Sequence, residues 1–318
     1  MRVNRTLLYA GIFLVAVGGV VVAADLALVD EALLADILSL WPLGVIALGL
    51  GLVLRRTRIS LSGGMLAAAV PGLLVGSAFA AAPRFTDFCG MGGELVPVTT
   101  QQGTVDEATS VSVTLECGSL DVGTAEGADW QLDARATEDV SAPSILPQPG
   151  RLAIASTNEE GWLTGGRDDW DLTLPTAALV EVSLYINAGR GDVDLAGATI
   201  DRFHVGAKAA DVHVDASTAT IAELTGYVDF GSLAVRLPDD DLIGAFTVHA
   251  GRIQICTPPD LGLRIVAEHS MGDVSVDGRH LGRTNYVSAN YDTTEHRADL
   301  EISVDFGSVE INPIGGCK

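Results

Sequence analysis

The sequence lacks the short motifs that mark the common enzyme families. It has no Gly-x-Ser-x-Gly segment, no His-Glu-x-x-His pair, no phosphate-binding loop ending in Lys and Ser or Thr, and no Gly-x-Gly-x-x-Gly segment opening a helix. These absences speak against hydrolase, metalloprotease and nucleotide-dependent chemistry. We therefore expect no enzyme activity, no catalytic residues and no cofactor.

Basic residues are scarce. The 318 residues include 19 Lys and Arg against 41 Asp and Glu, a formal charge of −22, and residues 83–318 alone hold 14 basic and 37 acidic residues. A surface this acidic repels phosphate backbones and anionic headgroups. Nucleic acid is therefore not expected as a partner, and the charge fits a solvated, exposed domain.

Cysteine is also rare, and no two cysteines have the Cys-x-x-Cys spacing of a zinc site. All four, Cys89, Cys117, Cys256 and Cys317, lie in the distal part of the chain. An even number in an oxidising compartment suggests one or two disulfides, with three full pairings open. We favour Cys89 with Cys117 and Cys256 with Cys317; four buried, unpaired thiols are the alternative.

The first 82 residues contain three long apolar runs, 7–24, 33–54 and 65–82. Each is long enough as a helix to approach or cross a hydrocarbon core of about 30 Å, and helices satisfy their own backbone polar groups in lipid. The sequence therefore predicts a membrane anchor of three transmembrane helices over 1–82.

The arginines predict how this anchor is oriented. Arg2 and Arg5 precede the first run, and Arg55, Arg56 and Arg58 separate the second and third. Cytoplasmic loops are rich in Arg and Lys, so both segments are expected inside and the distal domain outside, in a multi-pass protein of the cell membrane. A cleaved signal peptide over the first run is the alternative, but it would place the second arginine cluster outside.

Residues that favour close helix packing occur in the second and third runs. Gly72 and Gly76 form a Gly-x-x-x-Gly pair, and Pro42 after Trp41 is expected to kink or start the second helix.

A five-residue phrase recurs in the distal domain: a small residue, a polar residue, then Val, Leu or Ile at the third and fifth places. Copies begin 19 to 21 residues apart, with outlying copies at Gly118 and Gly307. The leading glycines fit tight bends. The other copies begin at Gly191, Ala210, Gly231, Gly251 and Gly272.

Repetition at about 20 residues is typical of stacked coils that bury their apolar rows only against their neighbours. Further strands are expected between the phrases, at 203–205, 221–224, 245–248 and 263–266. We predict membrane α plus all-β: a single-stranded β-solenoid-like ectodomain over 111–318, after a linker over 83–110. An antiparallel sandwich is the alternative, and 119–175 fits the repeat poorly.

Metal sites are only weakly indicated, and we predict none. His204 and His213 fall on nearby strands and could form a metal pair with Asp211 or Asp215. Aspartates beside glycines in the repeats could bind calcium, although the nonapeptide pattern of calcium-binding β-rolls is missing. Isolated, outward-facing side chains explain both sets.

The segment from Leu40 to Leu50, with its Trp-Pro pair followed by Ile-Ala-Leu-Gly and then Arg55 and Arg56, resembles the LiaI–LiaF-like transmembrane region. The repeat from Gly191 to Ile311 resembles the toastrack or putative-adhesin β-solenoid domain that often follows such helices. The resemblance implies a bacterial cell-envelope protein that takes part in an envelope stress response. It implies no catalytic residues.

These observations predict a function of contact rather than catalysis. The first interpretation is a regulatory or sensory partner of a membrane signalling system, with a membrane protein such as a sensor kinase as its partner. The alternative is a surface scaffold or adhesin that binds a cell-wall component or other cells without signalling. In both, the lipid bilayer holds the anchor.

Overall fold

The computed structural model describes residues 11, 14–16, 94–105, 109–137, 140–157, 166–176, 179–282 and 285–317. The chain divides into two compact units, Met1–Arg84 and Phe85–Lys318. Among the described residues, no helix is long and apolar enough to cross a bilayer. Apart from the helical residues 11 and 14–16, the three predicted helices fall outside the described residues, so the anchor stays a prediction. The same holds for Arg2, Arg5, Arg55, Arg56, Arg58, Trp41, Pro42, Gly72, Gly76 and Cys89.

The second unit is all-β in its described part and forms one 18-stranded hydrogen-bonded sheet. The strands are β1 (Leu95–Thr104), β2 (Ser110–Leu115), β3 (Gly118–Ala125), β4 (Asp129–Thr137), β5 (Ser144–Gln148), β6 (Arg151–Ala155), β7 (Asp168–Pro175), β8 (Leu179–Asp194), β9 (Thr199–Asp215), β10 (Thr220–Arg236), β11 (Leu242–Val248), β12 (Arg252–Cys256), β13 (Gly262–His269), β14 (Asp273–Val276), β15 (Arg279–His280), β16 (Tyr286–Val287), β17 (Arg297–Val304) and β18 (Ser308–Ile311). The strands expected between the phrases all lie within β9, β10, β11 and β13.

The central strands stack in parallel at a constant register. Val182 of β8 lies opposite Phe203 of β9, and Phe203 lies opposite Leu224 of β10, an advance of 21 residues at each step. This register confirms the repeat of about 20 residues. Parallel pairing also shows that the antiparallel sandwich is the wrong alternative.

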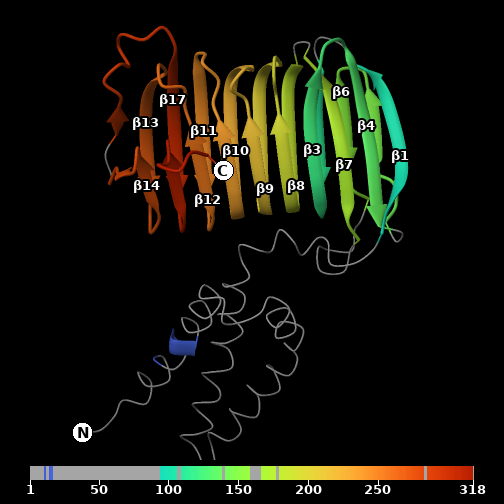
Figure 1. Ribbon diagram of the computed structural model, residues 1–318, viewed down its shortest axis with the longest axis horizontal. Helices are drawn as coiled ribbons and strands as arrows, with labels where there is room; N and C mark the ends of the chain where they lie inside the picture. Colours follow the sequence, from blue (N-terminus) through green and yellow to red (C-terminus); the bar gives the residue numbers. More distant parts are fainter. Residues whose placement is uncertain are drawn as a thin grey trace, which may run out of the picture. The chain divides into compact units, whose positions relative to one another are not determined.

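Each coil bends once, so that the sheet folds into two layers. Layer A holds β6, β2, the first halves of β8, β9 and β10, then β11, β17 and β13; layer B holds β7, β3, the second halves of β8, β9 and β10, then β12, β18 and β14. Figure 1 shows these strands standing side by side. Because side chains alternate along a strand, every second residue points between the layers into one apolar core that includes Trp170, Phe203 and Phe246.

The order of the coils in space differs from their order in the sequence. β17 lies between β11 and β13, and β18 lies between β12 and β14, so the last coil is inserted between two earlier ones. At the other end, β2 lies between β6 and β8, and β3 lies between β7 and β8. The copies at Gly118 and Gly307 are therefore full members of the stack. Within 119–175, which fits the repeat poorly, β6 and β7 form the coil next to β2 and β3.

Antiparallel strands cover both ends of the stack. β5 pairs with β6, β4 with β7 and β1 with β4 at one end; β16 pairs with β13 and β15 with β14 at the other. Such strands block edge-to-edge pairing with other chains. β1 also corrects the predicted linker over 83–110, because Leu95–Thr104 pairs along β4 instead of connecting domains.

Glycines occupy the bend because a neighbouring coil passes directly over it. Gly231 has φ 145°, and a Cβ there would lie 2.1 Å from the carbonyl oxygen of Ala210. Registers place Gly231, Gly251, Gly307 and Gly272 in one row, as expected for bend residues.

Gly191 is the exception, and its predicted role is wrong. It lies opposite Val212, two residues beyond the bend, whereas Gly189 lies opposite Ala210 and has φ 122°. Gly189 is therefore the bend residue of this coil. Gly191 is small because Ile186 fills the space, with its Cδ1 2.3 Å from where a Cβ would lie.

Candidate interaction surface

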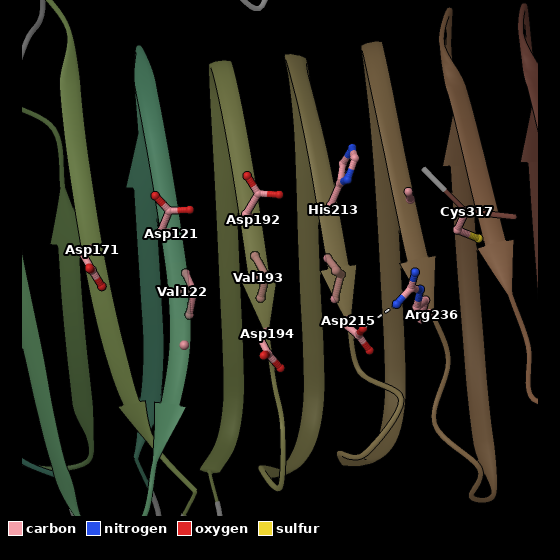
Figure 2. A pocket seen from close by; sticks show the side chains of 13 residues that line it. Asp121, Val122, Asp171, Asp192, Val193, Asp194, His213, Asp215, Arg236 and Cys317 are labelled. Carbon is pink, nitrogen blue, oxygen red and sulfur yellow. Dashed lines mark hydrogen bonds and ion pairs between the residues drawn. The ribbon is translucent and has the colours of Figure 1, made fainter.

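The outer surface of layer B carries a row of carboxylates, one on each of three adjacent strands. Asp121 of β3 lies opposite Asp171 of β7 on one side and Asp192 of β8 on the other, and His213 of β9 continues the row. These side chains point outward because they alternate with core residues such as Val122 and Val193. Figure 2 shows the row running across the strands.

A second row lies beside the first and contains opposite charges. Asp194 is opposite Asp215, and Asp215 is opposite Arg236, whose Nη1 lies 3.0 Å from Asp215 Oδ2. Together the two rows line an open groove of about 510 Å³, and Cys317 lies at its edge. Arg236 neutralises one end, so the groove is most acidic over β7, β3 and β8.

The charges within the groove influence one another. Partial burial raises the pKa of Asp121, and the carboxylates of Asp192, Asp169 and Asp171 raise it further. At Asp215 the hydroxyl of Ser217 donates a hydrogen bond of 2.6 Å that, with Arg236, lowers the pKa. Arg135 opposes the rise at Asp121, so the repulsion there is relieved only in part, and an approaching positive charge would relieve it further.

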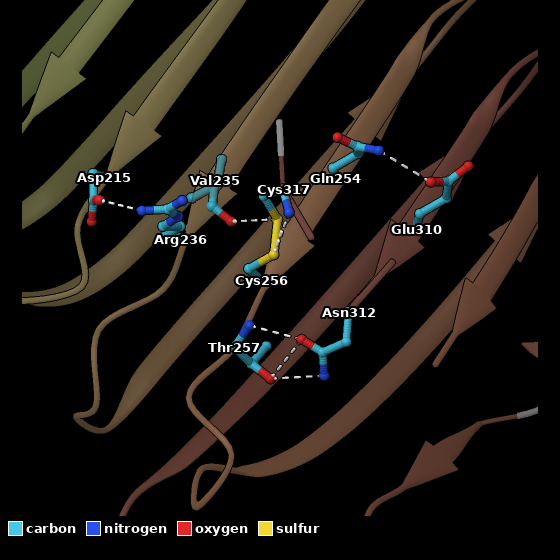
Figure 3. Close-up of a disulfide and its surroundings, with 9 residues drawn as sticks. All are labelled: Asp215, Val235, Arg236, Gln254, Cys256, Thr257, Glu310, Asn312 and Cys317. Atoms are coloured by element: carbon cyan, nitrogen blue, oxygen red, sulfur yellow. Dashed lines mark hydrogen bonds and ion pairs between the residues drawn. A yellow bond between two sulfur atoms is a disulfide. The ribbon is translucent and has the colours of Figure 1, made fainter. Parts of the chain in front are cut away.

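A disulfide joins the end of the chain to the groove side of the stack. Cys256, the last residue of β12, is bonded to Cys317, as expected from the sequence (Figure 3). Nearby, the backbone N–H of Thr257 donates to Asn312 Oδ1 at 2.9 Å and holds β12 beside β18. Cys117 is also disulfide-bonded, whereas Cys89, its expected partner, lies outside the described residues.

Of the residues considered as metal ligands, Asp192, Asp194, His213 and Asp215 line the groove, whereas the two histidines of the suggested pair lie apart. His204 lies in the first half of β9, in layer A, and His213 in its second half, in layer B. Asp211 accepts a hydrogen bond from Ser232, and Asp273 pairs with His280. Within the described ranges, no group of three or more His, Cys, Asp or Glu side chains is arranged to hold a metal ion.

Sequence reasoning missed the carboxylate row as a unit. The order of the strands in the sequence does not indicate that β3, with Asp121, lies between β7 and β8, and the Gly191 alignment placed Asp192 two residues out of register. A signal was present: starting the phrase at Gly189 gives equal 21-residue steps to Ala210 and Gly231.

Comparisons with known proteins show similarity without a family assignment. No family model and no curated protein matches the chain. Among solved structures, a candidate cell-adhesion protein from Clostridium sporogenes is 17% identical with a TM-score of 0.49 over 69% of this chain and 100% of its own. A candidate adhesin from Bacteroides fragilis is 10% identical with a TM-score of 0.31 over 69% of this chain and 98% of its own. The chain is also similar to a candidate lipid-binding protein from Parabacteroides distasonis, with 12% identity and a TM-score of 0.30 over 70% of this chain and 98% of the other.

Proposed function

We propose that this chain is a bacterial surface protein whose stacked-coil domain, of the β-solenoid type, works as an adhesin or scaffold by contact. The carboxylate row of Asp171, Asp121 and Asp192 carries this proposal. Three like charges in one groove repel each other, and a partner with spaced positive charges relieves that repulsion. The groove is open and shallow, which suits a macromolecular partner better than an enclosed small molecule.

The test compares full-length protein in detergent with a triple variant, Asp121→Asn, Asp171→Asn and Asp192→Asn, for binding to purified bacterial wall sacculi and to whole cells. We expect the triple variant to lose most of the binding, and the wild-type binding to weaken as salt rises. A matched control removes three exposed carboxylates from layer A: Asp201→Asn, Glu268→Gln and Glu301→Gln. Equal binding by the triple variant and the control would reject the groove as the contact surface.

The proposed location is the outer face of the cell membrane, with the anchor over 1–82 and its arginines inside. The Cys256–Cys317 disulfide supports an oxidising compartment for the second unit. Protease added to intact cells should digest the second unit, and protection from the protease would contradict this orientation.

Regulation of a membrane sensor kinase is the second proposed function. It is favoured by the Trp41-Pro42 segment and its resemblance to the LiaI–LiaF-like region. In this case deletion of the gene changes the output of a two-component system, and the protein co-purifies with a kinase. Unchanged stress-response transcripts after deletion would leave adhesion as the function.

A further inference from the structure

The outer surface of layer A carries two tyrosine rings over a glycine. Tyr185 of β8, Gly206 of β9 and Tyr227 of β10 share one register row. A Cβ at Gly206 would lie 2.7 Å from Cδ1 of Tyr185 and 3.8 Å from Cδ1 of Tyr227, so both rings reach over the bare backbone of Gly206. Gly206 is consequently buried although it lies in an outward-facing row. We call these three residues the tyrosine platform.

The two rings of the tyrosine platform are held differently. The Tyr227 hydroxyl donates to the carboxylate of Asp229, and its ring meets His249 edge-on at 5.4 Å between centroids. His249 is fixed in turn by Asp305, with 2.8 Å between Nδ1 and Oδ2. The bond to Asp229 raises the pKa of Tyr227 to about 12, so the phenol stays neutral. Tyr227 is therefore a preorganised ring.

Tyr185 is the accessible half of the platform. Its side chain is 43% exposed, and within the described residues no hydrogen bond engages its hydroxyl. A large exposed ring on a rigid strand offers a flat apolar face and a free hydroxyl at low entropic cost.

The neighbourhood of the platform is flat and rich in hydroxyl groups. Thr114 flanks Tyr185 in the same row, and Thr247 flanks Tyr227. In the adjoining row, His204 and Thr225 lie side by side and are half-buried; Ser183, next to His204, is buried, and its hydroxyl donates to Glu181. The Thr and His side chains around the platform are half-buried and are short or planar.

We propose that the tyrosine platform binds an extended, neutral glycan laid across the strands, which rests on and deepens the proposed adhesion function. The C–H face of a pyranose ring packs on an aromatic face, and its hydroxyls match the Thr and His side chains and the Tyr185 hydroxyl. Neighbouring coils lie about 4.8 Å apart, close to the length of one pyranose unit in an extended chain. The acidic domain repels anionic polymers, and a lipid or apolar peptide would bury these hydroxyls without partners.

The test is isothermal titration of the full-length chain, in a detergent without a sugar headgroup, with cellohexaose and with chitohexaose. We expect at least one of them to bind, Tyr185→Ala to weaken binding by about tenfold or more, and Tyr185→Phe to keep most of the affinity, because stacking dominates. Phe230→Ala is the matched control: Phe230 is 66% exposed, and it lies at the bend of β10 instead of in the platform row.

Three results would overturn the proposal: no binding of either hexasaccharide at millimolar concentration, unchanged affinity of Tyr185→Ala, or an equal loss in Phe230→Ala. The proposed function is judged separately by wall and cell binding of the carboxylate-row variant. Wall binding without any hexasaccharide binding would leave the adhesion function standing and remove the platform.

Discussion

At the scale of single residues, Asp168 is a carboxyl group buried among the coils. It is 1% exposed, it begins β7, and it accepts a hydrogen bond of 2.8 Å from the Ser156 hydroxyl. Burial raises the pKa of Asp168 to about 6, with the Ser156 bond opposing the rise. Between about pH 4 and pH 6, Asp168 is therefore protonated in the folded protein and ionised in the unfolded chain.

The first prediction concerns this proton. The pKa of Asp168 is near 3.8 in the unfolded chain. Between about pH 4 and pH 6 the folded state binds more protons, so the free energy of unfolding falls as pH rises through this window. The loss is about 2 to 3 kcal/mol, at 1.36 kcal/mol per pKa unit.

Asp168→Asn should flatten this dependence and stabilise the protein at pH 7.5 relative to wild type. Urea unfolding followed by tryptophan fluorescence at pH 4.5, 6.0 and 7.5 measures it. Asp201→Asn, an exposed position on β9, is the control and should follow the wild-type profile. If the free energy of unfolding of Asp168→Asn changed with pH as it does in wild type, Asp168 would not be the source of this pH dependence.

The bend glycine Gly231 carries the second residue-scale prediction. Gly231→Ala places a Cβ 2.1 Å from the Ala210 carbonyl oxygen at φ 145°, so the bend must shift or strain. We expect a loss of about 1–3 kcal/mol or more. Gly123→Ala in β3 is the matched control, because nothing lies within 4 Å of its Cβ position. Similar melting temperatures for the two variants would refute a steric role for the bend.

At the scale of elements, the sequence predicted the strands better than it predicted their neighbours. Alternation within each phrase predicts the layer B strands, since inward Val, Leu and Ile residues have no other way to be buried together. The phrase is almost the same in every coil, so it does not specify which coil lies beside which. The inserted positions of β3 and β18 follow from three-dimensional packing. Gly191 was similarly taken as the bend residue in place of Gly189, although the 21-residue spacing favours Gly189, and the register places the bend there.

The disulfide gives the element-scale prediction. Cys256 and Cys317 are 61 residues apart, and the enclosed loop contains β13 to β18. Closing a loop of this length stabilises the fold by about 4 kcal/mol in the chain-entropy model. The double variant Cys256→Ser and Cys317→Ser should lose up to that amount in urea unfolding at constant pH. Cys256→Ser alone should lose a similar amount, and a double variant as stable as wild type would show that β18 needs no covalent link.

At the scale of the whole second unit, the inserted last coil makes the C-terminal side resistant to fraying. β17 and β18 each lie between strands of two other coils. β1, the first strand, differs, because it is an antiparallel cover whose pairing partner is β4. Opening β17 and β18 therefore requires breaking two interfaces at once, which differs from a solenoid that winds in sequence order.

Hydrogen exchange tests this arrangement directly. Amides of β17 are bonded within a strand flanked on both sides, whereas β16 is a two-residue cover at the edge. Because exchange requires opening, β17 and β18 should exchange much more slowly than β15 and β16, although they are closer to the C-terminus. Mass spectrometry of peptides from the full-length chain measures both sets. The double cysteine variant separates insertion from the disulfide as the cause of protection. If insertion protects β17, its amides still exchange more slowly than those of β16 in this variant. Equal exchange rates would assign the protection to the covalent link.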